Sequence, residues 1–233
     1  MKKRIFSVFI VSSILLLSAC SGNAHEAPSE SRSANAASEI TSSETEEQVK
    51  ETVTENKVLI AYFSWAENAV QDNIDAMTSA SVKSPGNVAQ LAQWIENETG
   101  GDLFSIQVTE PYPADWDGCL TRANEEKADG THPDLSETLE NISEYDTVFL
   151  GYPNWWYSCP MAIFSFIDTH DLSDKNIYLF CSHGTGGLAG SVRDITAALP
   201  ESAVISDNVF HVFEDDTAGS KEDLQEWLNG IAN

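Results

Sequence analysis

Three segments of the sequence combine hydroxyl, aromatic and glycine residues in patterns that suit ligand binding. In the first, Ser64 and Trp65 are followed, after a long excursion, by Gly86 and Asn87 at the start of a predicted helix. The free backbone N–H groups and the positive dipole end of a helix N-terminus favour an anion such as phosphate. Helix capping by Ser84 or Asn87 is the alternative interpretation of the same residues.

The second segment is aromatic and reads Gly151-Tyr-Pro-Asn-Trp-Trp-Tyr-Ser-Cys-Pro160. Three consecutive aromatic side chains cannot all be buried on one side of a strand, so at least one ring must lie near the surface. A ring in that place can stack on a planar ligand. The alternative is a hydrophobic plug over the end of a sheet. The residues expected to contact a ligand here are Pro153, Asn154, Trp155 and Trp156.

The third segment is rich in glycine and reads Cys181-Ser-His-Gly-Thr-Gly-Gly-Leu-Ala-Gly190. Glycine allows the backbone to approach a ligand closely. The G-x-G-x-x-A pattern that begins at Gly184 is a weak fingerprint of dinucleotide binding. The pattern follows the fourth strand of the chain and not the first, so dinucleotide binding is not the favoured interpretation. The residues expected to contact a ligand are Ser182, His183, Gly184, Thr185, Gly186 and Gly187.

Short apolar runs predict the strands that position these three segments. The runs are 57–63, 103–108, 146–151, 177–181 and 209–213. Segments with helical character are 88–95, 115–129, 160–169, 192–199 and 224–231. Strands that alternate with helices predict an α/β fold, in which a parallel sheet is covered by helices on both faces.

Ligands of such sheets bind at the carboxyl ends of the strands. The three segments each follow a predicted strand, so we expect them to meet at this edge. An anion site beside an aromatic loop and a glycine-rich loop suits a flat ring compound that carries a phosphate. FMN has that shape.

These residues also resemble the flavodoxin family. The resemblance runs from about residue 57 to the C-terminus and implies a three-layer sandwich, a five-stranded parallel sheet in the order 2-1-3-4-5 and non-covalently bound FMN. It further implies that Ser64, Trp65, Gly86 and Asn87 hold the phosphate, while 153–156 and 182–187 flank the isoalloxazine. The matching pieces are Val58-Leu-Ile-Ala-Tyr-Phe-Ser64, Gly86-Asn87, Phe149-Leu-Gly-Tyr-Pro-Asn-Trp-Trp156 and Ser182-His-Gly-Thr-Gly-Gly187.

The sequence departs from this family pattern at two places in the phosphate loop. Residues 66–83 are inserted between Ser64-Trp65 and the Gly86-Asn87 pair, and we expect them to form a surface loop or a lid beside the flavin. Val88, which we also count among the cofactor-binding residues, stands where the family's loop closes on Thr, and this removes one hydroxyl donor.

The N-terminal segment predicts export. Three basic residues, Lys2 to Arg4, precede an apolar run at 5–17 that is too short to span a bilayer comfortably. The run ends in Leu17-Ser18-Ala19-Cys20, which resembles a bacterial lipobox with Cys20 as the lipidated residue. An ordinary secretory signal cleaved nearby is the alternative. We therefore expect a signal peptide at 1–19, a lipidated and disordered acidic tether at 20–56, and a folded domain at 57–233, anchored by lipid outside the cytoplasm.

Net charge restricts the partners. The chain of 233 residues has a formal charge of −25 at pH 7. Such a chain repels nucleic acid and anionic membrane surfaces, so we expect no nucleic-acid partner and membrane contact only through the lipid. It attracts a basic redox partner protein. The histidines show no metal-ligand spacing.

Three functions remain open from the sequence. The favoured one is a membrane-tethered FMN electron carrier, in which no residue of the chain is catalytic because the cofactor performs the redox chemistry. The second is an FMN-dependent NAD(P)H, quinone or metal reductase. The third is an interaction module of the same fold without flavin.

Overall fold

The computed structural model describes residues 57–70, 82 and 84–231. The predicted signal peptide, Cys20, the acidic tether and part of the insertion lie outside the described residues. Within the described part, no helix is long and apolar enough to cross a membrane.

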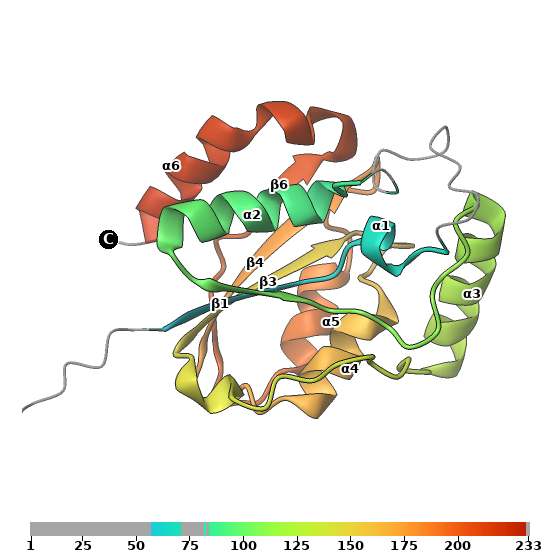
Figure 1. Cartoon of the computed structure of the whole chain (residues 1–233), viewed down its shortest axis with the longest axis horizontal. Helices are drawn as coiled ribbons and strands as arrows, with labels where there is room; N and C mark the ends of the chain where they lie inside the picture. Colours follow the sequence, from blue (N-terminus) through green and yellow to red (C-terminus); the bar gives the residue numbers. More distant parts are fainter. Residues whose placement is uncertain (1–56, 71–81, 83, 232–233) are drawn as a thin grey trace, which may run out of the picture. The chain divides into compact units, whose positions relative to one another are not determined.

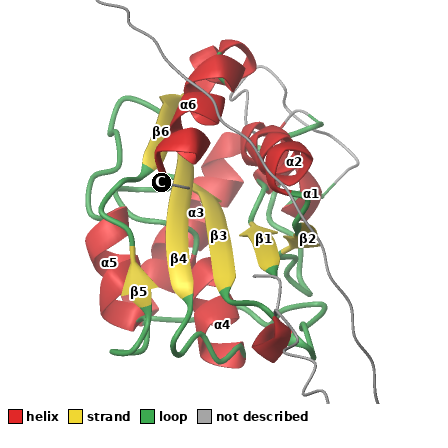
Figure 2. Ribbon diagram, turned by 90° about the vertical axis from the view of Figure 1, so that its left-hand side faces the viewer, coloured by secondary structure: helices red, strands yellow, loops and turns green. Residues whose placement is uncertain are grey.

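A parallel sheet forms the centre of the domain (Figure 2). All its strand pairs are parallel, and the sheet order 2-1-3-4-5 predicted from the sequence is confirmed. The order along the sheet is β2 (Asp102–Ser105), β1 (Val58–Tyr62), β3 (Thr147–Pro153), β4 (Asn176–His183) and β5 (Val204–Ile205), and β6 (Phe210–Phe213) also pairs with β4.

The outer position beside β4 is shared by two short strands. β5 pairs with the start of β4, where Asn176 is opposite Val204. β6 pairs with its end, where Phe180 is opposite Phe210. The sequence predicted β6 and missed β5, because a strand of two residues with Val204 exposed has no readable alternation of apolar side chains.

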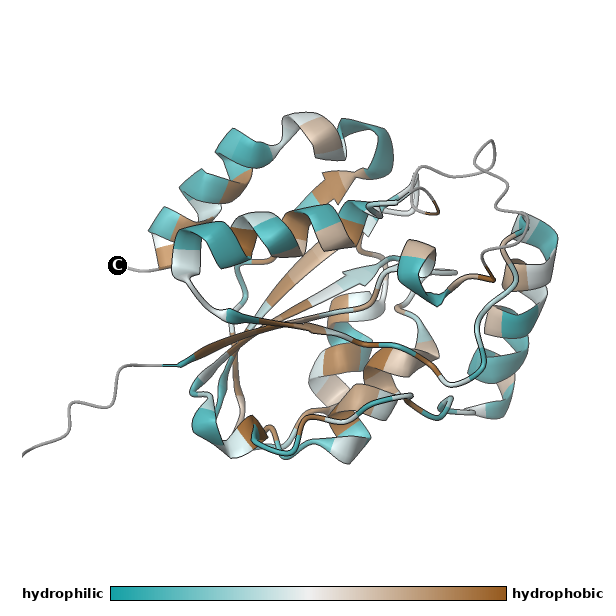
Figure 3. Ribbon diagram, in the orientation of Figure 1, coloured by the Kyte–Doolittle hydropathy of each residue, from teal (hydrophilic) through white to brown (hydrophobic). Residues whose placement is uncertain are grey.

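Helices cover both faces of the sheet (Figure 1). α2 (Asn87–Thr99) and α6 (Lys221–Ile231) lie on one face, and α4 (Met161–Thr169) and α5 (Ser191–Ala198) lie on the other. α3 (Trp116–Asp129) contributes to the same hydrophobic cluster as α4. In Figure 3 the hydrophobic colour is concentrated on the strands and alternates with hydrophilic colour along the helices, as expected of amphipathic helices.

Two hydrophobic clusters fill the spaces on either side of the sheet. In β1, Leu59 and Ala61 belong to the α4 side, whereas Ile60 belongs to the α2 side. Successive strand side chains point to opposite faces, so a strand buried on both faces reads as a continuous apolar run. Gly151 in β3 leaves room for a neighbouring ring, because a Cβ there would lie 2.1 Å from Cζ of Phe180.

The insertion differs from the surface loop that the sequence predicted. It begins within α1 (Trp65–Asn68), where Ala66 and Asn68 are buried, and Val82 near its end is fully buried. The backbone N–H of Tyr112 donates to the carbonyl of Asn68 at 2.7 Å. The prediction of a surface loop is therefore wrong for these residues, because Asn68 is bonded to the segment that precedes α3 and Val82 is buried in the hydrophobic cluster on the α4 side. The prediction of a lid concerns the rest of the insertion, which lies outside the described residues.

Candidate functional site

A cleft of about 230 Å³ lies at the carboxyl ends of the central strands. Its walls come from the segments that follow β1, β3 and β4, as the sequence analysis expected of a ligand site. The predicted residues that line it are Trp65, Pro153, Asn154, Trp155, Trp156, Ser182, His183, Gly184, Thr185 and Gly186.

Backbone hydrogen bonds fasten the two principal loops of the cleft to each other. Pro153 and Ser182 are opposite each other in the β3–β4 ladder. The backbone N–H of Asn154 donates to the Ser182 carbonyl at 2.9 Å, and its side-chain Nδ2 donates to the Leu188 carbonyl at 2.9 Å. The glycine-rich loop is closed by a bond from the N–H of Gly187 to the carbonyl of Gly184, at 3.2 Å. Gly187 itself does not line the cleft.

The aromatic loop divides into a buried part and an exposed part. Trp155 is only 8 % exposed, and its ring packs edge-on against Phe63 and Tyr112 at centroid distances of 5.4 and 5.2 Å. Trp156 is partly buried, and Tyr157 is 73 % exposed. The surface ring that the sequence pattern required is therefore Tyr157, while Trp155 serves the core as well as the wall of the cleft.

A strained turn aims these rings. Trp156 and Tyr157 both have positive φ, 47° and 66°, a conformation that side chains of their size rarely adopt. Two backbone hydrogen bonds between Trp155 and Ser158, at 3.0 and 2.9 Å, close the turn. Lys127 donates from Nζ to the Trp156 carbonyl at 2.8 Å. This support holds the exposed ring at the rim of the cleft.

Three lining residues were not predicted from the sequence. Trp116 opens α3, and its ring lies 6.1 Å from that of Trp156. Tyr157 belongs to the aromatic run and could have been added from that run alone. Glu214 follows β6, in the 3₁₀ segment η4 (Glu214–Gly219). No sequence pattern connects Trp116 or Glu214 to the other lining residues, because both reach the cleft only through the fold.

Of the residues expected to hold a phosphate, Trp65 lines the cleft. Ser64, Gly86, Asn87 and Val88 are not part of its lining. Asn87, the first residue of α2, donates from Nδ2 to Ser182 Oγ at 3.2 Å and to the Glu214 carbonyl at 2.8 Å. These bonds tie the N-terminus of α2 to two residues that line the cleft. Val88 is buried in the hydrophobic cluster on the α2 side of the sheet, so its side chain cannot contact a ligand there.

The hydroxyl of Ser64 is the strongest indication of a ligand site. Its Oγ is the buried side-chain polar atom for which the described residues offer no hydrogen-bond partner, and Ser64 is 1 % exposed. Buried hydroxyls are normally paired, so such an atom needs an explanation. Gly86 is the N-cap residue of α2, and no side chain caps this helix N-terminus. An orphaned hydroxyl and an uncapped helix N-terminus fit a phosphate group.

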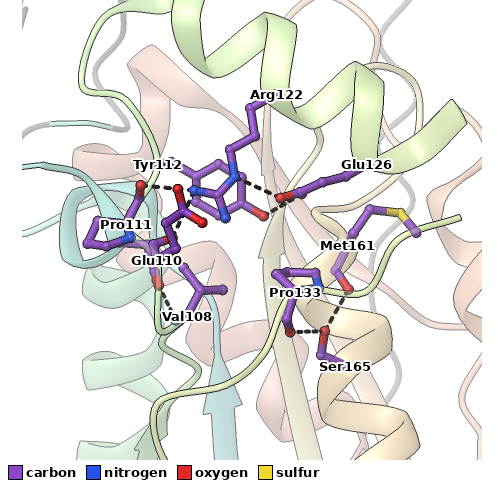
Figure 4. Close-up of polar contacts among 10 residues, drawn as sticks. Val108, Glu110, Pro111, Tyr112, Arg122, Glu126, Pro133, Met161 and Ser165 are labelled. Carbon is purple, nitrogen blue, oxygen red and sulfur yellow. Dashed lines mark hydrogen bonds and ion pairs between the residues drawn. The ribbon is translucent and has the colours of Figure 1, made fainter. Parts of the chain in front are cut away.

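A partly buried ion pair between Arg122 and Glu126 holds the segment that precedes α3 (Figure 4). Arg122 donates from Nε to Glu126 at 2.8 Å, and from Nη1 to the Glu110 and Pro111 carbonyls. The hydroxyl of Tyr112 donates to Glu126 at 2.7 Å. Burial, and then the charge of Glu126, raises the pKa of Tyr112 far above its usual range, so this phenol stays protonated. The network fixes the ring against which Trp155 packs.

The cysteines of the domain offer no redox chemistry to the cleft. Cys119, Cys159 and Cys181 are free and buried. Burial raises the pKa of the Cys119 thiol to about 12 and raises the pKa values of the other two thiols as well. A thiol is reactive as its thiolate, so all three are inert at neutral pH.

Comparisons with known proteins agree with this architecture. The flavodoxin family model matches residues 74–231. A protein from Bacteroides eggerthii that is designated a flavoprotein is 26 % identical, with a TM-score of 0.58, and the match covers 77 % of this chain and 99 % of that one. A Lactobacillus acidophilus flavoprotein, solved in complex with FMN, has the same fold at 16 % identity and a TM-score of 0.51, over 72 % of this chain and 99 % of its own. No curated protein matches the sequence. The matched range covers more than half of the chain, and the chain therefore belongs to the flavodoxin family.

Proposed function

We propose that this protein binds FMN and transfers electrons, and that a lipid on Cys20 holds it at a membrane outside the cytoplasm. The observation that carries the FMN assignment is the buried, unpartnered hydroxyl of Ser64 beside the aromatic cleft. The fold that this chain shares with the FMN-binding Lactobacillus acidophilus protein supports it. The export assignment is supported by the basic, apolar and Cys20-terminated pattern of the N-terminus.

Each part of the site has a role in binding. Ser64 and the backbone N–H groups at Gly86 and Asn87 would hold the phosphate. The loops at 153–157 and 182–187 would enclose the ring system, with Trp156 and Tyr157 limiting the access of water. FMN, when bound, supplies one- and two-electron transfer, whereas the chain binds it, orients it and sets its surroundings.

The acidic charge of the chain favours a basic partner. A net charge of −25 would steer a positively charged redox protein toward this one, and salt would screen the attraction. We therefore expect electron transfer to such a partner to slow as ionic strength rises. A rate that is independent of salt would contradict the assignment of a basic partner.

An FMN-dependent reductase is the second candidate. It is favoured by the exposed aromatic rim, because Trp116 and Tyr157 can present their faces to a second planar ligand above the cleft. Steady-state oxidation of NADH or NADPH by the FMN-loaded protein separates the two candidates. An electron carrier shows almost none, and sustained turnover would identify a reductase.

The primary test is FMN titration of the purified protein, followed by flavin fluorescence and visible absorbance. Saturable quenching at micromolar protein is the expected result. No binding at tens of micromolar would overturn the FMN assignment and favour the flavin-free interaction module.

The lipid anchor is tested separately with Cys20→Ser, which should move the protein from the membrane fraction to the aqueous fraction. A variant that stays in the membrane fraction would exclude lipidation at Cys20 as the anchor.

A further inference from the structure

His183, the last residue of β4, meets His211 of the neighbouring strand β6. His183 Nε2 lies 3.0 Å from His211 Nδ1, and the ring centroids are 5.2 Å apart. His183 lines the cleft, and it also lines a second groove together with His211, Asp216 and Asp223. The pair therefore connects the wall of the cleft with a second, outer surface.

The hydrogen bonds define which nitrogens carry protons. His183 Nδ1 lies 2.8 Å from the Gly184 carbonyl oxygen, which can only accept, so this nitrogen must carry a proton. In neutral His183 the other nitrogen, Nε2, is then an acceptor. His211 must donate to it from Nδ1. In the neutral pair both rings are consequently Nδ1–H tautomers.

The same geometry limits the pair to one additional proton. A single proton added at His211 Nε2 leaves the inter-ring hydrogen bond intact, and the bridging proton can then reside on either ring. A second proton would place N–H groups on both facing nitrogens and break the bond. Groups coupled in this way titrate as a pair, in two separated steps.

The surrounding charges favour the first proton. Glu214 from η4 lines the cleft beside His183. Asp216 from η4 and Asp223 from α6 line the groove beside His211. Cys181, opposite His211 in the ladder, has a thiol pKa raised by burial and stays neutral. Among the described residues that line the cleft and the groove there is no Lys or Arg.

Burial opposes charge on the pair at either step, and the first proton also opposes the second. Burial, and then the charge of His183, lowers the pKa of His211. Since the two rings are in direct contact, each protonated ring disfavours charge on the other.

We propose that His183 and His211 together bind one shared proton, and that negative charge placed in the cleft strengthens the binding of this proton. The second clause rests on the proposed function, because electrons delivered to bound FMN are the source of that charge. The step itself is proton binding from solvent: the neutral pair takes up H⁺ at an imidazole nitrogen and gains one positive charge. No proton needs to pass to the cofactor.

The first arm of the test needs no cofactor. Long-range proton–nitrogen NMR spectra of ¹⁵N-labelled protein report the tautomer and charge of each imidazole across a pH titration. We expect Nδ1–H tautomers for both rings at alkaline pH, then a common first midpoint, and a second step lower by at least about one pH unit. In His211→Gln the second step should be absent, because only one imidazole of the pair remains. His132→Gln is the matched control, because His132 is paired with Asp168 elsewhere, and it should leave both midpoints unchanged.

Independent titration of the two rings at one ordinary midpoint, or an Nε2–H tautomer at His183, would overturn the shared proton. The second arm repeats the titration on FMN-loaded protein before and after reduction by dithionite. The first midpoint should move to higher pH on reduction in the wild type. A midpoint that does not move would overturn the linkage and leave the shared proton standing. Absence of FMN binding would be seen in the visible spectrum, and it would overturn the linkage together with the proposed function.

Discussion

Replacing Ser64 by Ala should lower the ligand affinity without lowering the stability of the ligand-free protein. In the ligand-free protein the Ser64 hydroxyl is buried and has no hydrogen-bond partner among the described residues. A buried, unsatisfied polar group costs about 1–3 kcal/mol. Removal of this hydroxyl should therefore leave the free energy of unfolding unchanged or raise it by up to about that amount.

The same substitution removes a donor to a charged ligand. Hydrogen bonds to charged groups contribute about 1.5–3 kcal/mol. By the conversion of 1.4 kcal/mol per factor of ten, the affinity for FMN should fall by about 10- to 150-fold. The affinity for riboflavin, which lacks the phosphate, should change little.

A paired serine provides the matched control. Ser191 is fully buried, and its hydroxyl bonds to the Tyr152 hydroxyl at 3.0 Å and to the Leu188 carbonyl at 2.7 Å. Ser191→Ala leaves a buried partner unsatisfied and should destabilise the protein by about 1–3 kcal/mol.

The stability of both ligand-free variants is measured by urea unfolding. The ligand affinity of Ser64→Ala is measured by titration with FMN and with riboflavin. The reasoning is refuted if Ser64→Ala destabilises the free protein as much as Ser191→Ala does. It is equally refuted if the variant binds FMN as tightly as the wild type.

Three further substitutions test the packing and the polar contacts around the site. Arg122→Leu removes the cation beside the buried Glu126 carboxylate and should cost about 1–3 kcal/mol in urea unfolding. Adding Glu126→Gln should recover part of the loss, and no recovery would contradict the argument from the unpaired charge. Gly151→Ala places a Cβ 2.1 Å from the Phe180 ring and should lower the free energy of unfolding by about 1–3 kcal/mol or more. Phe180→Leu should lower it less in the Gly151→Ala protein than in the wild type. If the two losses simply add, the new methyl group does not clash with the Phe180 ring. His170 is buried, donates from Nδ1 to a backbone carbonyl at 2.8 Å and accepts a backbone N–H at Nε2 at 2.9 Å, and burial lowers its pKa. Its contribution to stability should thus be complete above pH about 6.5 and decline as pH falls through that value, because the unfolded chain then binds the proton more readily. Unfolding at pH 7.5 and 5.5 should differ more in the wild type than in His170→Gln, and equal differences would exclude His170 as the cause.

The sequence alone determined most of the fold. Apolar runs identified β1, β3 and β4, and the helical spacing of apolar residues identified α2, α5 and α6. These patterns are informative because a strand or a helix repeats its orientation at a regular period, and burial on one face therefore recurs along the chain. The alternation of strands and helices then predicted a parallel sheet, and the parallel sheet predicted one edge at which the three loops meet. The cleft lies at that edge.

The tertiary structure decided what each loop side chain does there. The aromatic run did not reveal that Trp155 packs into the core while Tyr157 lies at the rim. Nor did the sequence predict the meeting of His183 with His211 or the burial of Val82 within the insertion. Loop residues have no repeating orientation, so their local sequence does not encode where they point. Their surroundings come from segments far away in the chain, and those are brought together only when the sheet and its helices pack.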